Sequence, residues 1–200
     1  MYGTLSANQG GGAGAGIDNY CGSFSPGGLG GYATNPATTP NEGSSGSLCA
    51  GGNTYGSANF TNASGHPISI AMGSGGGGGG HSCNSCNPQP GAIGGGIVIV
   101  IANSISVSGS ILSNGGNSIS DVACGIASGG AAAGGSIYLS GSSMNLTGGT
   151  ITALGGYEDG SAWATPYTGN ASNGRIQLDY NVLSGTTTPA AGYTRTGANF

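Results

Sequence analysis

The sequence predicts an all-β protein: a glycine-rich β-solenoid of the parallel β-helix type, with long ordered Gly/Ser/Asn loops and almost no helix. Three observations carry this prediction. Glycine contributes 47 of the 200 residues. From residue 94 onward, short runs of β-branched residues alternate with Ser and Thr and are bounded by Gly, which is the pattern of strands. These runs recur at a constant step, and no window has the i, i+3, i+4 apolar spacing of a helix.

The repeat unit contains three short strands. The expected strands lie at 97–101, 104–108 and 110–113, then at 136–139, 143–147 and 150–154, with a third start at 174–180. Equivalent positions are 39 residues apart, since 137 − 98 and 176 − 137 are both 39. A unit of this size cannot bury its own apolar residues, so units stack in parallel and equivalent positions form buried rows. The expected rows are Val98/Ile137/Ile176, Val100/Leu139/Leu178, Ile105/Met144, Val107/Leu146 and Ile111/Ile151.

The texture of the sequence divides the chain into three parts. Residues 1–93 form a loop-rich segment with an N-terminal strand, packed on the solenoid. Residues 94–193 form the repeat domain, and residues 194–200 form a C-terminal tail. Within the repeat domain, the Gly-rich stretches 115–135 and 155–174 are expected to be loops between turns. An antiparallel sandwich is the alternative, because it also has short Gly-bounded strands, but the fixed step favours the solenoid.

The outward positions of the first strand differ between units. In the later units they are polar or mixed: Ser136, Tyr138, Ser140, Arg175, Gln177 and Asp179. In the first unit they are Ile97, Ile99 and Ile101. A strand that is apolar on both faces is typically buried on both. We therefore expect this second face to be covered, either by the Gly-rich N-terminal segment or by a neighbouring subunit.

Composition excludes several classes of partner. Charged residues make up 4% of the chain, and its only cations are Arg175 and Arg195. A nucleic-acid partner is not expected, because phosphate contacts need clustered Lys and Arg. The longest apolar run, 97–102, is far too short for a membrane span. The first residues lack the basic and apolar regions of a secretory signal. With a net charge of only −4, little repulsion separates copies of the chain. This favours an assembled, extracellular protein.

Five cysteines point to the same compartment, because disulfides persist outside the cell. They are Cys21, Cys49, Cys83, Cys86 and Cys124. At least one intramolecular disulfide is expected, with Cys21–Cys49 and a bond from Cys83 or Cys86 to Cys124 as candidates. The Cys83-x-x-Cys86 spacing is also that of a metal or redox motif. However, a zinc site needs four ligands, and only His66, His81 or Cys124 could complete one. We expect no metal and no cofactor.

Other candidate sites have plain structural alternatives. Glu158 and Asp159 could contribute to a Ca²⁺ site, but no ladder of acidic residues surrounds them, and solvated turn residues are the better interpretation. Four Asn-x-Ser/Thr sequons mark candidate glycosylation sites, at Asn59, Asn62, Asn145 and Asn170. The loop from Tyr157 to Tyr167, which contains Trp163, could bind sugars or protein partners or could cap the core. No catalytic arrangement is found, so we expect no enzyme activity.

The repeat resembles a known group of proteins. A Gly-rich tract, an apolar strand and then the Ser-Ile-Ser-Val-Ser-Gly-Ser-Ile-Leu-Ser-Asn-Gly-Gly stretch at 104–116 resemble the glycine-rich β-repeat proteins of prokaryotic cell surfaces and phage tail fibres. Residues 174–180 and 183–192 are similar to the end of such repeat regions in secreted prokaryotic proteins. The resemblance covers 94–193 and the first ten residues. It implies an extracellular structural or adhesive protein, and no catalytic residues.

We therefore expect a non-enzymatic subunit of an extracellular filament or surface fibre. Residues 4–7 look like the last strand of an incomplete unit, and the strands after Asp179 look degenerate, so both ends would expose strand edges that invite pairing. Head-to-tail contacts of this kind build filaments. The interface candidates are Thr4, Leu5, Ser6, Ala7, Ile97, Ile99 and Ile101. The alternatives are a receptor-binding adhesin such as a phage fibre tip, located at the virion surface and binding a cell-surface glycan or protein, and an ice- or surface-binding protein.

Overall fold

The fold is all-β in the part of the chain that the structure describes. The structure is a computed structural model that describes residues 4–6, 60–61, 70–76, 90–117, 130–158 and 169–197. These residues contain no helix, and all but one of their strand pairs are parallel. The exception is β7 (Tyr157–Glu158), which pairs antiparallel with β8 (Gly169–Asn170). The parallel pairing expected from the repeat is therefore confirmed.

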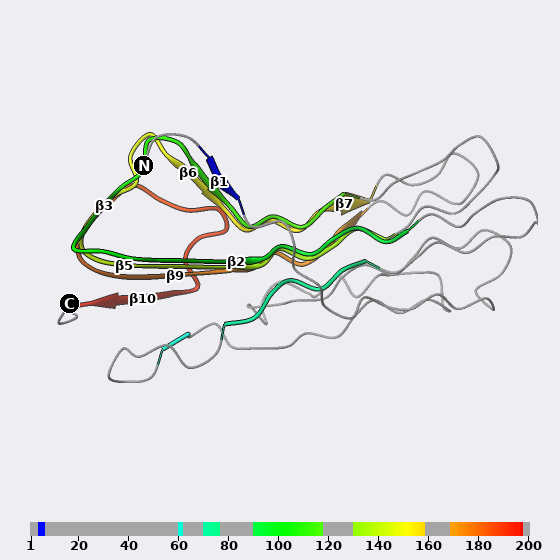
Figure 1. The fold of residues 1–200 in the computed structure, drawn as a ribbon, viewed down its shortest axis with the longest axis horizontal. Helices are drawn as coiled ribbons and strands as arrows, with labels where there is room; N and C mark the ends of the chain where they lie inside the picture. Colours follow the sequence, from blue (N-terminus) through cyan, green and yellow to red (C-terminus); the bar gives the residue numbers. More distant parts are fainter. Residues whose placement is uncertain are drawn as a thin grey trace, which may run out of the picture.

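Two parallel sheets hold the repeat strands. The larger sheet has the order β10-β9-β5-β2, with β2 at Ile97–Ile101, β5 at Ser136–Asn145, β9 at Arg175–Ser184 and β10 at Tyr193–Thr196. Strand β3 (Ser104–Ser106) pairs with the second half of β5. The smaller sheet has the order β1-β4-β6, with β1 at Thr4–Ser6, β4 at Ser110–Leu112 and β6 at Thr150–Thr152. In Figure 1 the strands of each sheet lie over one another along separate sides of the core.

The register of the sheets follows the 39-residue step. Val98 pairs with Ile137 and Ile137 with Ile176, while Val100 pairs with Leu139 and Leu139 with Leu178. Ile105 pairs with Met144 and Ile111 with Ile151. At the N-terminal end, Leu5 pairs with Ile111, so β1 occupies the third-strand position of a unit. The predicted register is thus confirmed in both sheets.

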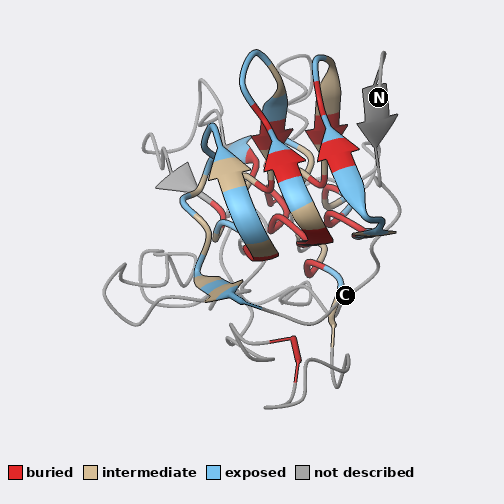
Figure 2. Cartoon of the chain, turned by 90° about the vertical axis from the view of Figure 1, so that its left-hand side faces the viewer, coloured by how far each residue is buried: buried red, intermediate tan, exposed pale blue. Residues whose placement is uncertain are grey.

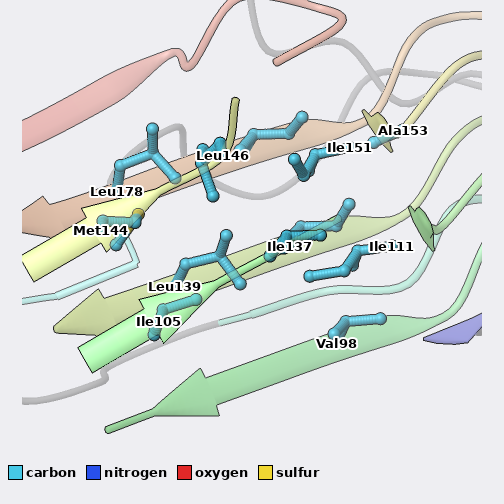
Figure 3. Packing of buried hydrophobic residues seen from close by; sticks show 12 residues of the cluster. Val98, Ile105, Ile111, Ile137, Leu139, Met144, Leu146, Ile151, Ala153 and Leu178 are labelled. Atoms are coloured by element: carbon cyan, nitrogen blue, oxygen red, sulfur yellow. The ribbon is translucent and has the colours of Figure 1, made fainter. Parts of the chain in front are cut away.

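The predicted inward rows form the core. The buried cluster contains Val98, Ile105, Val107, Ile111, Ile137, Leu139, Met144, Leu146, Ile151, Ala153, Ile176 and Leu178, with Val100 partly buried against it. Figure 3 shows these side chains pointing toward one another from the facing strands. Full burial of one such aliphatic side chain stabilises the fold by about 1.5–3 kcal/mol. Figure 2 shows the buried residues inside the stack and exposed residues on its outer surface.

The Gly-rich stretches differ from the loops that the sequence predicted. Residues 73–76, 92–96, 113–117, 130–135, 153–156 and 171–174 are extended segments that lie side by side and bond through their backbones. The central segment, 130–135, bonds to all five others: Gly134 N donates to Ser172 O, Gly135 N to Ser113 O and Ala133 N to Ser74 O, while Ala132 O accepts from Gly156 N and Gly130 O from Ala92 N. We call this set of segments the glycine bundle.

Glycine is required in the bundle because the backbones approach too closely for a side chain. A Cβ at Gly135 would overlap the carbonyl oxygen of Gly96, and a Cβ at Gly174 would overlap that of Gly135. Only Gly fits where extended chains pack backbone to backbone in this way. The high glycine content is therefore partly a packing requirement. It leaves no apolar periodicity in the sequence, which is why these segments resemble loops.

The C-terminal region also differs from the prediction. The strands after Asp179 are not degenerate, because β9 continues unbroken to Ser184. Residues 185–192 then cross over the strands between the two sheets (Figure 1), and Thr188 forms a parallel bridge to Thr152 of β6. Strand β10 follows and pairs with β9, spanning the boundary expected between the repeat domain and a C-terminal tail. We refer to residues 185–196 as the C-terminal cap.

Candidate assembly surface and the polar cluster beside it

Strand β2 presents an apolar row at the edge of the larger sheet. The side chains of Ile97, Ile99 and Ile101 are 37%, 50% and 65% exposed. The structure therefore leaves exposed the face that was expected to be covered. Gly96 O and Ala102 N bond to β5. Because alternate residues of a parallel strand bond to opposite sides, the backbone groups of the three isoleucines point to the open edge. We call Ile97, Ile99 and Ile101 the β2 row.

The second face of β5 and β9 is, in contrast, buried. The outward residues expected at a polar surface are all nearly inaccessible: Ser136, Tyr138, Ser140, Arg175, Gln177 and Asp179. This corrects the prediction for the later units. The cover includes segments distant in sequence, since Ser136 Oγ donates to Ala71 O and Gln177 bonds to residues 60 and 61. Figure 1 shows residues 60–61 and 70–76 in a layer on this side of the sheet.

The buried face contains a connected polar cluster around Gln177 and Asp179. Phe60 N donates to Gln177 Oε1 at 2.6 Å, and Gln177 Nε2 donates to Thr61 Oγ1 at 2.9 Å and to Asp179 Oδ1 at 3.0 Å. Tyr138 OH donates to Asp179 Oδ2 at 2.7 Å. A buried polar side chain is costly unless its hydrogen bonds are made, and here each bond also fixes one strand or segment against another.

Tyr138 has a shifted proton affinity. Burial raises the pKa of its phenol, because the phenolate would lose hydration, and the hydrogen bond to the Asp179 carboxylate raises the pKa further. The tyrosine therefore stays protonated and acts as a donor. This arrangement suits a structural role, in which the hydroxyl holds a buried carboxylate in place.

Arg195 brings the C-terminal cap into the same cluster. Its Nη2 donates to Asp179 Oδ2 at 2.8 Å, with Asp179 fully buried and the Arg195 side chain 21% exposed. The pairing of Arg195 with Asp179 is also part of the β10–β9 register. Sequence analysis missed this contact. The available signal was an acidic residue inside an apolar strand, in a chain with only two cations.

The other predicted site residues are placed as follows. Thr4, Leu5 and Ser6 form β1 on the edge of β4, and Ala7 lies outside the described residues. Asn145 is exposed and its Oδ1 accepts from Thr147 N at 3.0 Å, and Asn170 lies in β8. Tyr157 is 45% exposed rather than capping the core. The residues outside the described part are the five cysteines Cys21, Cys49, Cys83, Cys86 and Cys124, with His66, His81, Asn59, Asn62, Asp159, Trp163 and Tyr167.

Two searches cover the described residues only. They contain no group of three His, Cys, Asp or Glu side chains arranged to hold a metal ion. They also contain no helix of the length and hydropathy needed to cross a membrane.

Comparison with known proteins gives no relative. No family model matches the chain, and no curated protein or solved structure matches it. The interpretation of the molecule therefore depends on its own geometry.

Proposed function

We propose that the chain is a non-enzymatic structural subunit of an extracellular filament or surface fibre, built on a β-solenoid. The solenoid is supported by the simultaneous 39-residue register of both sheets. For β2, β3 and β4 to pair in order with their equivalents, the chain must return to the same side of the core after each unit. Stacked units of this kind form an elongated core with two ends.

The β2 row is the observation that carries the proposal. It combines an open strand edge with three exposed isoleucines, and exposed edges of this kind pair readily with another chain. No charged side chain occurs within β2 to discourage pairing. The low net charge adds little repulsion between copies.

The direction of the strands suits head-to-tail assembly. Strands β2 and β10 are the two edges of one sheet, and every pair in that sheet is parallel. A second copy that is translated along the sheet brings its β2 beside the far edge of the first copy in the same direction. Repeating this translation builds an open filament rather than a closed ring.

A receptor-binding fibre tip is the second candidate, and the C-terminal cap favours it. The cap covers the far end of the stack through β10 and the Thr188 bridge, whereas β2 stays open at the other end. A module with one closed and one open end suits the end of a fibre. Its open end would join the shaft, and its closed end would face the target cell.

Negative-stain electron microscopy of the purified protein distinguishes the two candidates. A filament subunit forms long unbranched polymers, and Ile99→Lys shortens or abolishes them because it places a charge in the β2 row. Val182→Lys is the matched control, since Val182 is 62% exposed on β9 and outside the row. Discrete particles that bind cells support the fibre tip. Polymers that are unchanged by Ile99→Lys contradict assembly through β2.

A further inference from the structure

The two ends of the stack are complementary in a specific way. The last turn contains β9, which occupies the first and second strand positions through its pairing with both halves of β5. Its third position, beside β6, holds only the single bridge from Thr188 to Thr152. At the other end, β1 occupies a third-strand position beside β4. The end that has only a bridge at its third position therefore matches an end that begins with a third strand.

We propose that the C-terminal cap is a displaceable, autoinhibitory segment, and that β1 and β2 of a second copy replace it during assembly. This inference rests on the proposed filament and adds the partner surface and its regulation. In the joined state, β2 of the incoming copy takes the place of β10 on β9. Strand β1 of the incoming copy takes the place of the Thr188 bridge on β6.

The replacement continues the apolar rows of the core. In the capped state Gly192 N bonds to Ile176 O, and Thr194 pairs with Leu178. With the incoming strand in the register used between turns, Val98 would stand beside Ile176 and Val100 beside Leu178. In the smaller sheet, Leu5 of the incoming copy would stand in register with Ile151. The joined state thus places aliphatic residues where the cap has glycine and threonine.

The cap itself makes little apolar contact. Thr194 and Thr196 are exposed, and Tyr193 and Arg195 are only half-buried. Of the cap residues, only Ala191 packs against the core cluster. Its strongest side-chain attachment is the ion pair from Arg195 to the buried Asp179.

This ion pair opposes the replacement. In the register of the joined state, Ile101 of the incoming copy would stand beside Asp179, where Arg195 stands now. Asp179 would then keep Tyr138 and Gln177 but lose its cation, and an uncompensated buried carboxylate is strongly unfavourable. The remaining cation, Arg175, lies on β9 itself and is already engaged. The Asp179–Arg195 pair therefore controls whether the β9 edge is available.

Sedimentation or light-scattering measurements of mass against concentration test the inference. The variants are Arg195→Gln, which releases the cap, and a chain ending at Ser184, which lacks it. Arg195→Lys keeps the charge and is the matched control. We expect Arg195→Gln to lower the concentration needed for assembly by about tenfold or more, with a larger effect in the shortened chain. Arg195→Lys stays closer to the wild-type protein.

Adding Ile99→Lys separates the two levels of the proposal. If the cap is autoinhibitory, Ile99→Lys reverses the gain in assembly in both variants. If Arg195→Gln and the shortened chain assemble no better than the wild type, while Ile99→Lys still weakens wild-type assembly, the cap hypothesis is wrong and the filament proposal stands. If Ile99→Lys has no effect in any form, both proposals fail. Should the shortened chain lose its β-sheet circular dichroism, the full-length Arg195→Gln variant decides the question.

Discussion

Asp179 and Arg195 form an ion pair of 2.8 Å between the last turn of the stack and the strand that covers it. Asp179 is fully buried and lies on the second face of β9, together with Gln177 and the hydroxyl of Tyr138. Arg195 belongs to β10. One contact therefore links the cap, the larger sheet and the covering segment at residues 60–61. This position gives the pair its influence on how the far end of the molecule behaves.

The glycine bundle predicts that single methyl groups are not tolerated at its close contacts. Gly135→Ala would place a Cβ against the carbonyl oxygen of Gly96, so we expect a loss of about 1–3 kcal/mol or more in unfolding free energy. Gly116→Ala is the control, because its Cβ would be 3.2 Å from Ala92 Cβ, a milder contact. Urea denaturation measures both. Equal losses in the two variants would contradict close backbone packing as the reason for glycine.

The central core row predicts a large cost for truncation. Ile137 is fully buried between Val98 and Ile176, so Ile137→Ala should reduce the unfolding free energy by about 2–5 kcal/mol through lost contacts and a residual cavity. Val182→Ala, at an exposed position of β9, should change it by about 0.5 kcal/mol or less. Thermal and urea denaturation of the two variants provide the comparison. A small effect at Ile137 would mean that the stacked rows do not form the core.

Tyr138 predicts a loss of stability in alkali. Burial raises its pKa in the folded state above the unfolded value of about 10. The unfolded chain therefore releases this proton first as the pH rises. The contribution of Tyr138 is complete below pH about 10 and is lost as the pH rises through its folded pKa.

Chemical denaturation between neutral pH and pH about 11 measures this effect, with a slope of up to about 1.4 kcal/mol per pH unit from one group. Tyr138→Phe should be less stable at neutral pH, because it removes the donor to Asp179, but its stability should fall less steeply in alkali. Tyr157→Phe, at an exposed position, is the control. Equal alkaline slopes for the wild type and Tyr138→Phe would contradict the prediction.

Gln177 predicts protection of a backbone amide far away in the sequence. Phe60 N donates to Gln177 Oε1 at 2.6 Å, so the amide proton of Phe60 should exchange slowly with solvent. Gln177→Leu removes the acceptor and should speed this exchange while leaving the protection of Ile137 and Leu139 largely intact. Asn181→Leu, which changes an exposed side chain on the same strand, serves as the control. Fast exchange at Phe60 in the wild type would contradict the proposed cover of β9.

The strand register could be predicted from the sequence because its signal is local and repeated. The 39-residue step places Val98, Ile137 and Ile176 in one row, and both sheets follow it. Even the pairing of β1 with β4 was expected from the likeness of residues 3–8 to 109–114. Stacking requires equivalent residues to coincide, so a constant step determines the register.

The covered second face could not be predicted in the same way. Tyr138, Gln177 and Asp179 alternate with apolar residues as solvent-facing side chains do, and the segment that meets Gln177 is more than a hundred residues away. The glycine bundle was missed because backbone packing leaves no side-chain pattern. The cap was missed because β10 has no apolar alternation and is held by one ion pair.

The spacing of subunits along a wild-type filament tests the central claim most directly. If β2 of one copy replaces β10 on the next, each copy contributes three levels to the larger sheet, from β2, β5 and β9. The axial rise measured by cryo-electron microscopy should then be about 14 Å per subunit, which is three strand spacings. If copies instead stack on β10, four levels give about 19 Å. A rise of about 19 Å, or particles that stay discrete at every concentration even with Arg195→Gln, would contradict the account.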